Sequence, residues 1–139
     1  MKRCSPVFAI TLIVLFCSCK KSDVTSTDPF ELAGTWKLTE IYADPGDGSG
    51  KFRKIEGKKI LEFTKEGKVK STNGDLCLIN INSNANESSN FKIKEMYSGL
   101  NKIIVEKCDT EISFEIKSDE LTLYYNCFEG CGEKFKRVN

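Results

Sequence analysis

The sequence contains no histidine, and this absence excludes several kinds of chemistry. Without an imidazole there is no Ser-His or Cys-His nucleophile pair, no imidazole general base and no His-ligated zinc. No spacing of carboxylates, lysines or tyrosines marks a catalytic site in their place. We therefore expect a protein that is not an enzyme and that carries no cofactor and no metal.

An excess of charge of one sign is also missing. The chain has 21 Lys and Arg against 20 Asp and Glu, so its formal net charge is +1. This balance is too even for a protein that binds nucleic-acid phosphates or that holds a membrane through a basic surface. With 139 residues, of which 40% are hydrophobic, the chain is long enough for one domain with its own core.

Long apolar runs are rare, and the one that stands out lies near the N-terminus. Residues 7–16 are apolar except for Thr11, and Lys2 and Arg3 precede them. As a helix this run would rise about 15 Å, roughly half the hydrocarbon thickness of a bilayer. It is therefore too short for a permanent membrane span and is typical of the core of a signal peptide.

The residues after this run resemble the lipobox of bacterial lipoproteins. The small residue Ser18 stands directly before Cys19, although Phe16 stands where Leu is usual and Cys17 offers a second thiol. The resemblance implies cleavage between Ser18 and Cys19, a diacylglycerol on the Cys19 sulfur and acylation of the new amino group. Several acyl chains at about 0.8 kcal/mol per buried CH₂ would hold the protein to a membrane.

This interpretation divides the chain into a signal peptide (1–18), a flexible tether (19–29) and a folded domain (30–139). The tether is rich in polar turn-forming residues. Lys20 follows the lipidated cysteine, where an Asp retains many lipoproteins at the inner membrane. By the same resemblance we expect a lipid-anchored protein of the outer membrane, on its periplasmic or its surface face.

From residue 30 onward the apolar residues recur every second position, which predicts strands. Residues 112–117 and 121–125 form the clearest hairpin, and residues 59–64 and 68–71 form a second one around Gly67. Further strands are expected at 34–42, 77–82, 91–97, 102–107 and 134–138. The compositions of residues 44–50 and 83–90 predict loops, the first of them a mobile connection at the mouth of a barrel rather than a phosphate or calcium loop.

About eight short strands joined by tight turns indicate an all-β domain, either an antiparallel sandwich or a closed barrel. Periodicity alone does not choose between them. A barrel leaves no exposed sheet edge, which is an advantage for a protein held at high density on a membrane.

The start of the first strand resembles a known family. Gly34-x-Trp36 is similar to the G-x-W signature of the lipocalins, and Arg137 stands near the end of the last expected strand. The resemblance implies a small antiparallel up-and-down β-barrel of about eight strands in which Trp36 closes one end and Arg137 lies over it. It also implies that the barrel binds a small, probably apolar ligand without transforming it.

The folded domain is shorter than a full lipocalin and has no convincing C-terminal helix. An eight-stranded barrel either holds one small ligand or is filled by its own side chains. The alternative function is therefore a structural or protein-interaction subunit of the envelope, with a filled barrel that docks to another protein. An apolar cavity of about 300 Å³ or more would favour the carrier.

The domain retains an even number of cysteines in a compartment that favours disulfides. They are Cys77, Cys108, Cys127 and Cys131. The hairpin of residues 112–125 brings Cys108 close to Cys127 or Cys131, which favours a bond from Cys108 to one of them and from Cys77 to the other. A local Cys127–Cys131 bond together with Cys77–Cys108 is the alternative.

Four tyrosines combine an apolar ring with a hydroxyl and can line a pocket or a partner surface. They are Tyr42, Tyr97, Tyr124 and Tyr125. The alternation of the strand places Tyr124 on the face opposite to Leu123 and Tyr125, so we expect Tyr124 on the outside of the barrel.

Overall fold

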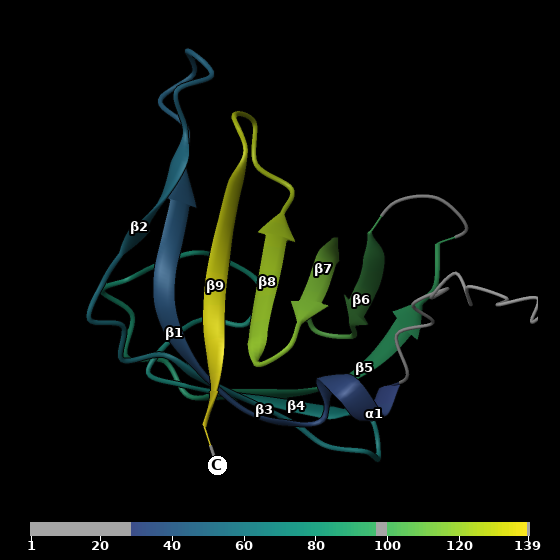
Figure 1. Ribbon diagram of the computed structural model, residues 1–139. Helices are drawn as coiled ribbons and strands as arrows, with labels where there is room; N and C mark the ends of the chain where they lie inside the picture. The colour runs from purple at the N-terminus through teal and green to yellow at the C-terminus, as the bar shows by residue number, and fades with distance from the viewer. Residues whose placement is uncertain (1–28, 97–99, 139) are drawn as a thin grey trace, which may run out of the picture.

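A computed structural model describes residues 29–96 and 100–138 (Figure 1). The signal peptide, Cys19, the tether up to residue 28 and Tyr97 lie outside the described residues. The elements are α1 (Pro29–Leu32), β1 (Gly34–Ala43), β2 (Lys51–Lys54), β3 (Ile60–Phe63), β4 (Lys68–Thr72), β5 (Glu87–Lys94), β6 (Asn101–Val105), β7 (Glu111–Lys117), β8 (Glu120–Tyr125) and β9 (Cys131–Val138). Across the described ranges, no helix is long and apolar enough to pass through a membrane.

The strands form one antiparallel sheet that closes on itself. Strands β3 to β9 pair in sequence order, and β1 joins β3 on one side to β9 on the other. β1 pairs with two strands along the same edge. Residues 34–37 pair with β3, and residues 40–43 pair with β2. Eight strands therefore close the barrel and β2 extends its wall. The predicted small up-and-down barrel is confirmed, and the sandwich is excluded.

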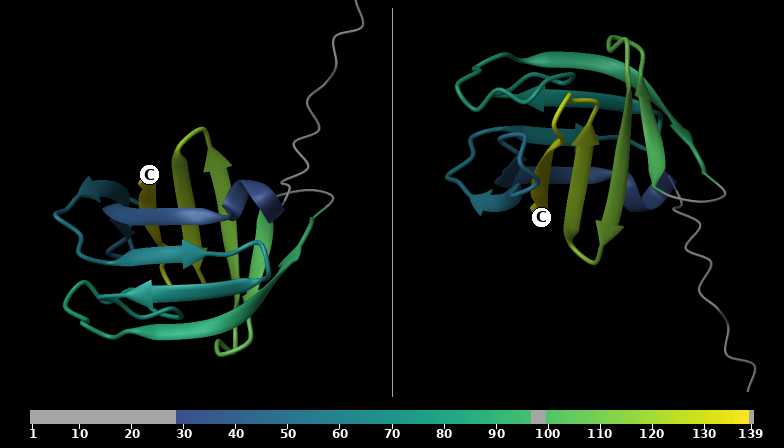
Figure 2. Two further views of the ribbon diagram at one scale, coloured as in Figure 1. Left: turned by 90° about the horizontal axis from the view of Figure 1, so that it is seen from below. Right: turned by 90° about the horizontal axis from the view of Figure 1, so that it is seen from above.

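Alternation along the strands fills the interior with apolar side chains. Figure 2 shows β1 and β3–β5 on one side of the barrel and β7–β9 on the other. Between them lie Trp36, Leu38, Leu61, Phe63, Val69, Phe91, Ile103, Val105, Ile112, Phe114, Leu121, Leu123 and Phe135, all buried. The rings of Phe63 and Phe91 meet edge to face at 5.2 Å, a favourable geometry for aromatic pairs.

The antiparallel order gives the barrel two different ends (Figure 1). The helix end carries α1, the turns after β3 and β7, and the C-terminal residues of β9. The loop end carries the connections that follow β1, β4, β6 and β8, which are residues 44–50, 73–86, 106–110 and 126–130. Residues 44–50 are thus a connection at the mouth of the barrel, as predicted.

Two expectations about the middle of the chain are wrong. Residues 77–82 are irregular instead of a strand, and residues 87–90, expected in a loop, begin β5. Leu76 is buried in the core and the Cys77 sulfur is bonded to Cys108, so this segment is fixed by its side chains rather than by a strand ladder. The start of β5 is polar, because Ser88 and Asn90 point outward into water. The composition of these residues therefore resembles that of a loop. The short strand β2 was also missed.

Candidate functional site

The helix end is closed by the residues of the G-x-W signature and Arg137. Trp36 is completely buried, and its indole N–H donates to the carbonyl of Leu32 at 2.9 Å. Trp36 and Arg137 face each other across β1 and β9, and the guanidinium carbon lies 4.0 Å from the centroid of the indole ring. The predicted contact between these two residues is confirmed.

Gly34 makes room for this arrangement. Its φ is +141°, and a Cβ at this position would collide with Nη1 of Arg137. The guanidinium uses the free space to donate to the carbonyls of Ala33 (2.8 Å) and Glu31 (2.6 Å). It thereby satisfies backbone oxygens around the C-terminal end of α1 that the short helix leaves without partners. The signature residues close this end of the barrel, so a binding surface has to be sought elsewhere.

All four described cysteines lie at the loop end. Cys77 is bonded to Cys108, which ties residues 73–86 to residues 106–110, and Cys127 is bonded to Cys131. The predicted disulfides are confirmed as two bonds, but the favoured pairing of Cys108 with Cys127 or Cys131 is wrong. Residues 73–86 fold back toward Cys108, while Cys127 and Cys131 flank one tight connection and reach each other. The alternative pairing is the one that forms.

We expect the two disulfides to contribute unequally to stability. Cys77–Cys108 spans 31 residues and Cys127–Cys131 spans 4. In the chain-entropy model, loops of these lengths correspond to about 3.7 and about 1.9 kcal/mol. Denaturant titration of the pair Cys77→Ser/Cys108→Ser and of the control pair Cys127→Ser/Cys131→Ser measures the difference. Equal losses, or labelling of any of the four thiols in unreduced protein by an alkylating reagent, would contradict it.

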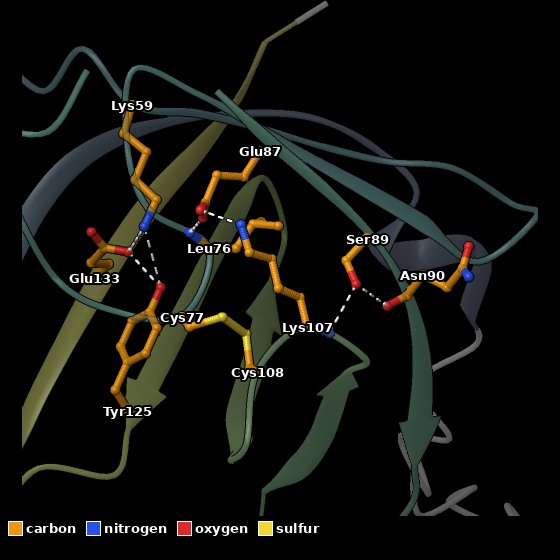
Figure 3. Close-up of a disulfide and its surroundings, with 10 residues drawn as sticks. All are labelled: Lys59, Leu76, Cys77, Glu87, Ser89, Asn90, Lys107, Cys108, Tyr125 and Glu133. Carbon is orange, nitrogen blue, oxygen red and sulfur yellow. Dashed lines mark hydrogen bonds and ion pairs between the residues drawn. A yellow bond between two sulfur atoms is a disulfide. The ribbon is translucent and has the colours of Figure 1, made fainter. Parts of the chain in front are cut away.

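A buried polar cluster lies inside the barrel near the loop end (Figure 3). Lys59 Nζ and the Tyr125 hydroxyl both donate to Glu133 Oε2 at 2.6 Å, and the lysine and tyrosine are 3.4 Å apart. The side chains of Lys59 and Glu133 are only 4% and 1% exposed. Burial, followed by the charge of Glu133 and its hydrogen bond, raises the pKa of Tyr125 well above the usual value for a tyrosine. The phenol therefore stays protonated and can only donate to the carboxylate.

Residues 73–86 cover this cluster. Gly74 lies on the aliphatic part of Lys59, where a Cβ would come within 2.6 Å of Cγ and Cδ. The Ser71 hydroxyl donates to the Gly74 carbonyl at 2.6 Å, and the amide of Leu76 donates to Glu87 at 2.8 Å. Leu76 adds an apolar contact, since it belongs to the buried core. The covering segment is thus held by packing, hydrogen bonds and a disulfide together.

The sequence analysis missed this cluster although a signal was present. Each polar residue of the cluster stands two positions from a buried apolar residue. The pairs are Lys59 and Leu61, Tyr125 and Leu123, and Glu133 and Phe135. Because alternate residues of a strand point to the same face, this alternation places each of the three polar groups inside the barrel. A lysine, a glutamate and a tyrosine at inward positions together indicate an internal ion pair.

Three hollows in the described part of the molecule are open and lined mainly by polar residues. One of about 310 Å³ lies between residues 55–59 and 80–84. Another of about 470 Å³ lies on the outer wall beside Tyr124, and a third of about 280 Å³ separates residues 44–48 from residues 128–129. Tyr124 lies on the outside as predicted, whereas the ring of Tyr125 packs against the core.

The loop end also presents an isolated aromatic ring. Phe128 is fully exposed on the connection that the Cys127–Cys131 disulfide closes. Beside it, Asp44 accepts hydrogen bonds from the amides of Gly46, Gly48 and Gly50, and the first of these is the largest cause of its lowered pKa. Local hydrogen bonds thus shape residues 44–50, and a local disulfide closes residues 126–130.

Comparisons of the chain with protein-family models, with curated proteins and with solved structures find no match. A proposal of function therefore rests on the residues of this chain alone.

Proposed function

We propose that this protein is a lipid-anchored envelope subunit whose filled barrel docks another envelope protein through the loop end. The observation that carries the proposal is Phe128, a fully exposed ring on a connection closed by a disulfide. Aromatic residues dominate the energetics of protein interfaces. A ring held on a closed loop loses little conformational freedom on binding, so more of its burial energy is retained as affinity.

The point at which the tether joins the barrel also supports docking through the loop end. Pro29, the first described residue, begins α1 at the helix end, whereas Phe128 lies on the β8–β9 connection at the loop end. A lipid on Cys19 would thus be joined to the barrel at the helix end. A ten-residue tether of the kind predicted from the sequence would span about 15–20 Å on average. The anchor would hold the helix end near the membrane and direct the loop end away from it, toward a partner.

The carrier of a small apolar ligand is the less supported function. Apolar side chains occupy the interior of the described barrel, and an ion pair lies near its loop end. A carrier of an apolar ligand requires an apolar cavity of about 300 Å³ or more. An apolar compound that remains bound to the protein in native mass spectrometry would favour the carrier over the docking subunit.

A photocrosslinking experiment tests the docking proposal. The photoreactive analogue p-benzoylphenylalanine replaces Phe128 in one variant and Val138, a partly exposed residue at the helix end, in the control. After illumination of intact envelopes we expect one discrete adduct from position 128 and none from position 138. No adduct from position 128, or the same adducts from both positions, would refute docking through the loop end.

Mass spectrometry of the envelope protein tests the anchor separately. We expect an N-terminal peptide that begins with acylated Cys19. An unmodified N-terminal peptide recovered from the soluble fraction would refute the lipid anchor but not the docking surface.

A further inference from the structure

A row of outward-pointing residues crosses the wall of the barrel at one level. Successive partners in this row are Phe52, Tyr42, Gly132, Tyr124, Ser113 and Lys102, on β2, β1, β9, β8, β7 and β6. Tyr124 stands between two small residues, Gly132 on one side and Ser113 on the other. Since neither neighbour has a large side chain, the wall has room for a ring on each side of Tyr124.

The space over Gly132 is already filled by a ring of the protein itself. The Phe52 ring reaches over from β2, with its centroid 5.3 Å from that of Tyr42 and 6.4 Å from that of Tyr124. A Cβ on Gly132 would lie 3.5 Å from Phe52 Cζ and 3.4 Å from Tyr124 Cδ1. Lys134 Nζ lies over the Phe52 ring, 4.6 Å from its centroid. This side of Tyr124 is therefore closed.

The space over Ser113 is open and forms the hollow of about 470 Å³. Tyr124 contributes to one side of it, and Lys102 and Glu111, whose charged atoms are 2.6 Å apart, contribute to its lining from β6 and β7. The lining also includes Asp109, Thr110 and Asn126. Its volume lies within the range of about 300–1,000 Å³ that small-molecule sites occupy.

The lining has hydrogen-bonding capacity that the described residues do not use. The side chains of Thr110, Ser113 and Asn126 and the hydroxyl of Tyr124 have no hydrogen-bond partner among the described residues. Hydroxyl and amide groups both donate and accept hydrogen bonds. The lining has one positive charge, on Lys102, against the carboxylates of Glu111 and Asp109, so it does not select an anion.

A flat aromatic ring beside groups that both donate and accept suits a ligand that is apolar on one face and hydroxylated at its rim. A pyranose ring has this character, with C–H groups on its faces and hydroxyls around its edge. We propose that the hollow beside Tyr124 binds a neutral pyranoside, which lies over Ser113 with its C–H face on the Tyr124 ring. The site is separate from Phe128 and does not depend on the docking proposal.

Titration with four neutral disaccharides tests the site. Maltose, cellobiose, lactose and N,N′-diacetylchitobiose are added to the full-length protein, and binding is followed by saturation-transfer NMR and by calorimetry. We expect saturable binding of at least one of them. We expect Tyr124→Ala to weaken that binding about tenfold or more, because the stacking surface is lost. Absence of saturable binding to all four sugars would overturn the proposal.

Two further variants keep the test decisive. Ser113→Phe fills the hollow from an outward position without entering the core, and we expect it to abolish binding even if Tyr124→Ala unfolds the protein. The matched control is Tyr42→Ala, a tyrosine of the same row that does not line the hollow, and it should change the affinity less than about twofold. Binding that survives both Ser113→Phe and Tyr124→Ala would overturn the site. Phe128→Ala should leave sugar binding unchanged, which separates this site from the docking surface.

Discussion

Trp36→Ala is expected to lower the free energy of unfolding by about 3–5 kcal/mol, as for other large aromatic residues removed from a core. Trp36 has no exposed surface, and its indole N–H is bonded to the Leu32 carbonyl. The substitution therefore leaves a cavity and also removes the partner of a buried backbone oxygen. Denaturant titration measures the loss. The control is Phe52→Ala, which removes a partly buried ring from the outer wall and should cost clearly less.

The contribution of Arg137 to stability can be measured separately from that of the buried Trp36 ring. Its guanidinium lies 4.0 Å from the indole centroid and donates to two carbonyls. A cation–π contact contributes about 0.5–2 kcal/mol, depending on how far it is shielded from water. Arg137→Lys retains the charge but loses the planar stack and the two parallel donors, so it should be milder than Arg137→Ala but not neutral. If Arg137→Ala leaves the melting temperature unchanged, the cation–π contact makes no measurable contribution, and the loss in Trp36→Ala arises from the cavity and from the unpaired Leu32 carbonyl.

The barrel could be predicted because its strands alternate strictly where one face is buried. Residues 112–117 and 121–125 show this pattern, and they lie in β7 and β8. The contact of Trp36 with Arg137 followed from the resemblance, since a closed barrel makes the first and last long strands neighbours. β5 could not be predicted in the same way, because the residues before Phe91 are polar on both faces.

The loop end was less accessible to sequence reasoning because its contacts join segments without regular structure. The favoured disulfide pairing assumed that the β7–β8 hairpin alone positions Cys108. In the structure the position of Cys77 depends on Leu76 entering the core and on Gly74 lying on Lys59. These contacts connect distant parts of the chain, and no local pattern encodes them. Tyr124 was placed correctly on the outer wall, because that prediction needed only the alternation of inward and outward side chains along one strand.

Removing one partner of the ion pair inside the barrel should lower the free energy of unfolding strongly. Replacing the whole pair by apolar residues should change it little. Lys59→Met leaves the Glu133 carboxylate buried without its cation, and Glu133→Leu leaves the Lys59 ammonium without its anion. Removing one partner of a buried pair typically costs about 3–5 kcal/mol, whereas replacing the whole pair by apolar residues is often neutral or stabilising. We therefore expect each single variant to lose several times more stability than the combined one.

Tyr125 has to be included in the combined variant, because its hydroxyl donates to the same carboxylate oxygen as Lys59. Without Glu133 that hydroxyl would be buried without an acceptor, at a cost of about 1–3 kcal/mol. Lys59→Met/Glu133→Leu/Tyr125→Phe replaces the entire cluster, and we expect its unfolding free energy to lie within about 1 kcal/mol of the native value or above it. Denaturant titration of the two single variants and the triple variant measures this. If the triple variant is as unstable as the single ones, the losses come from packing beneath residues 73–86 and not from uncompensated charge.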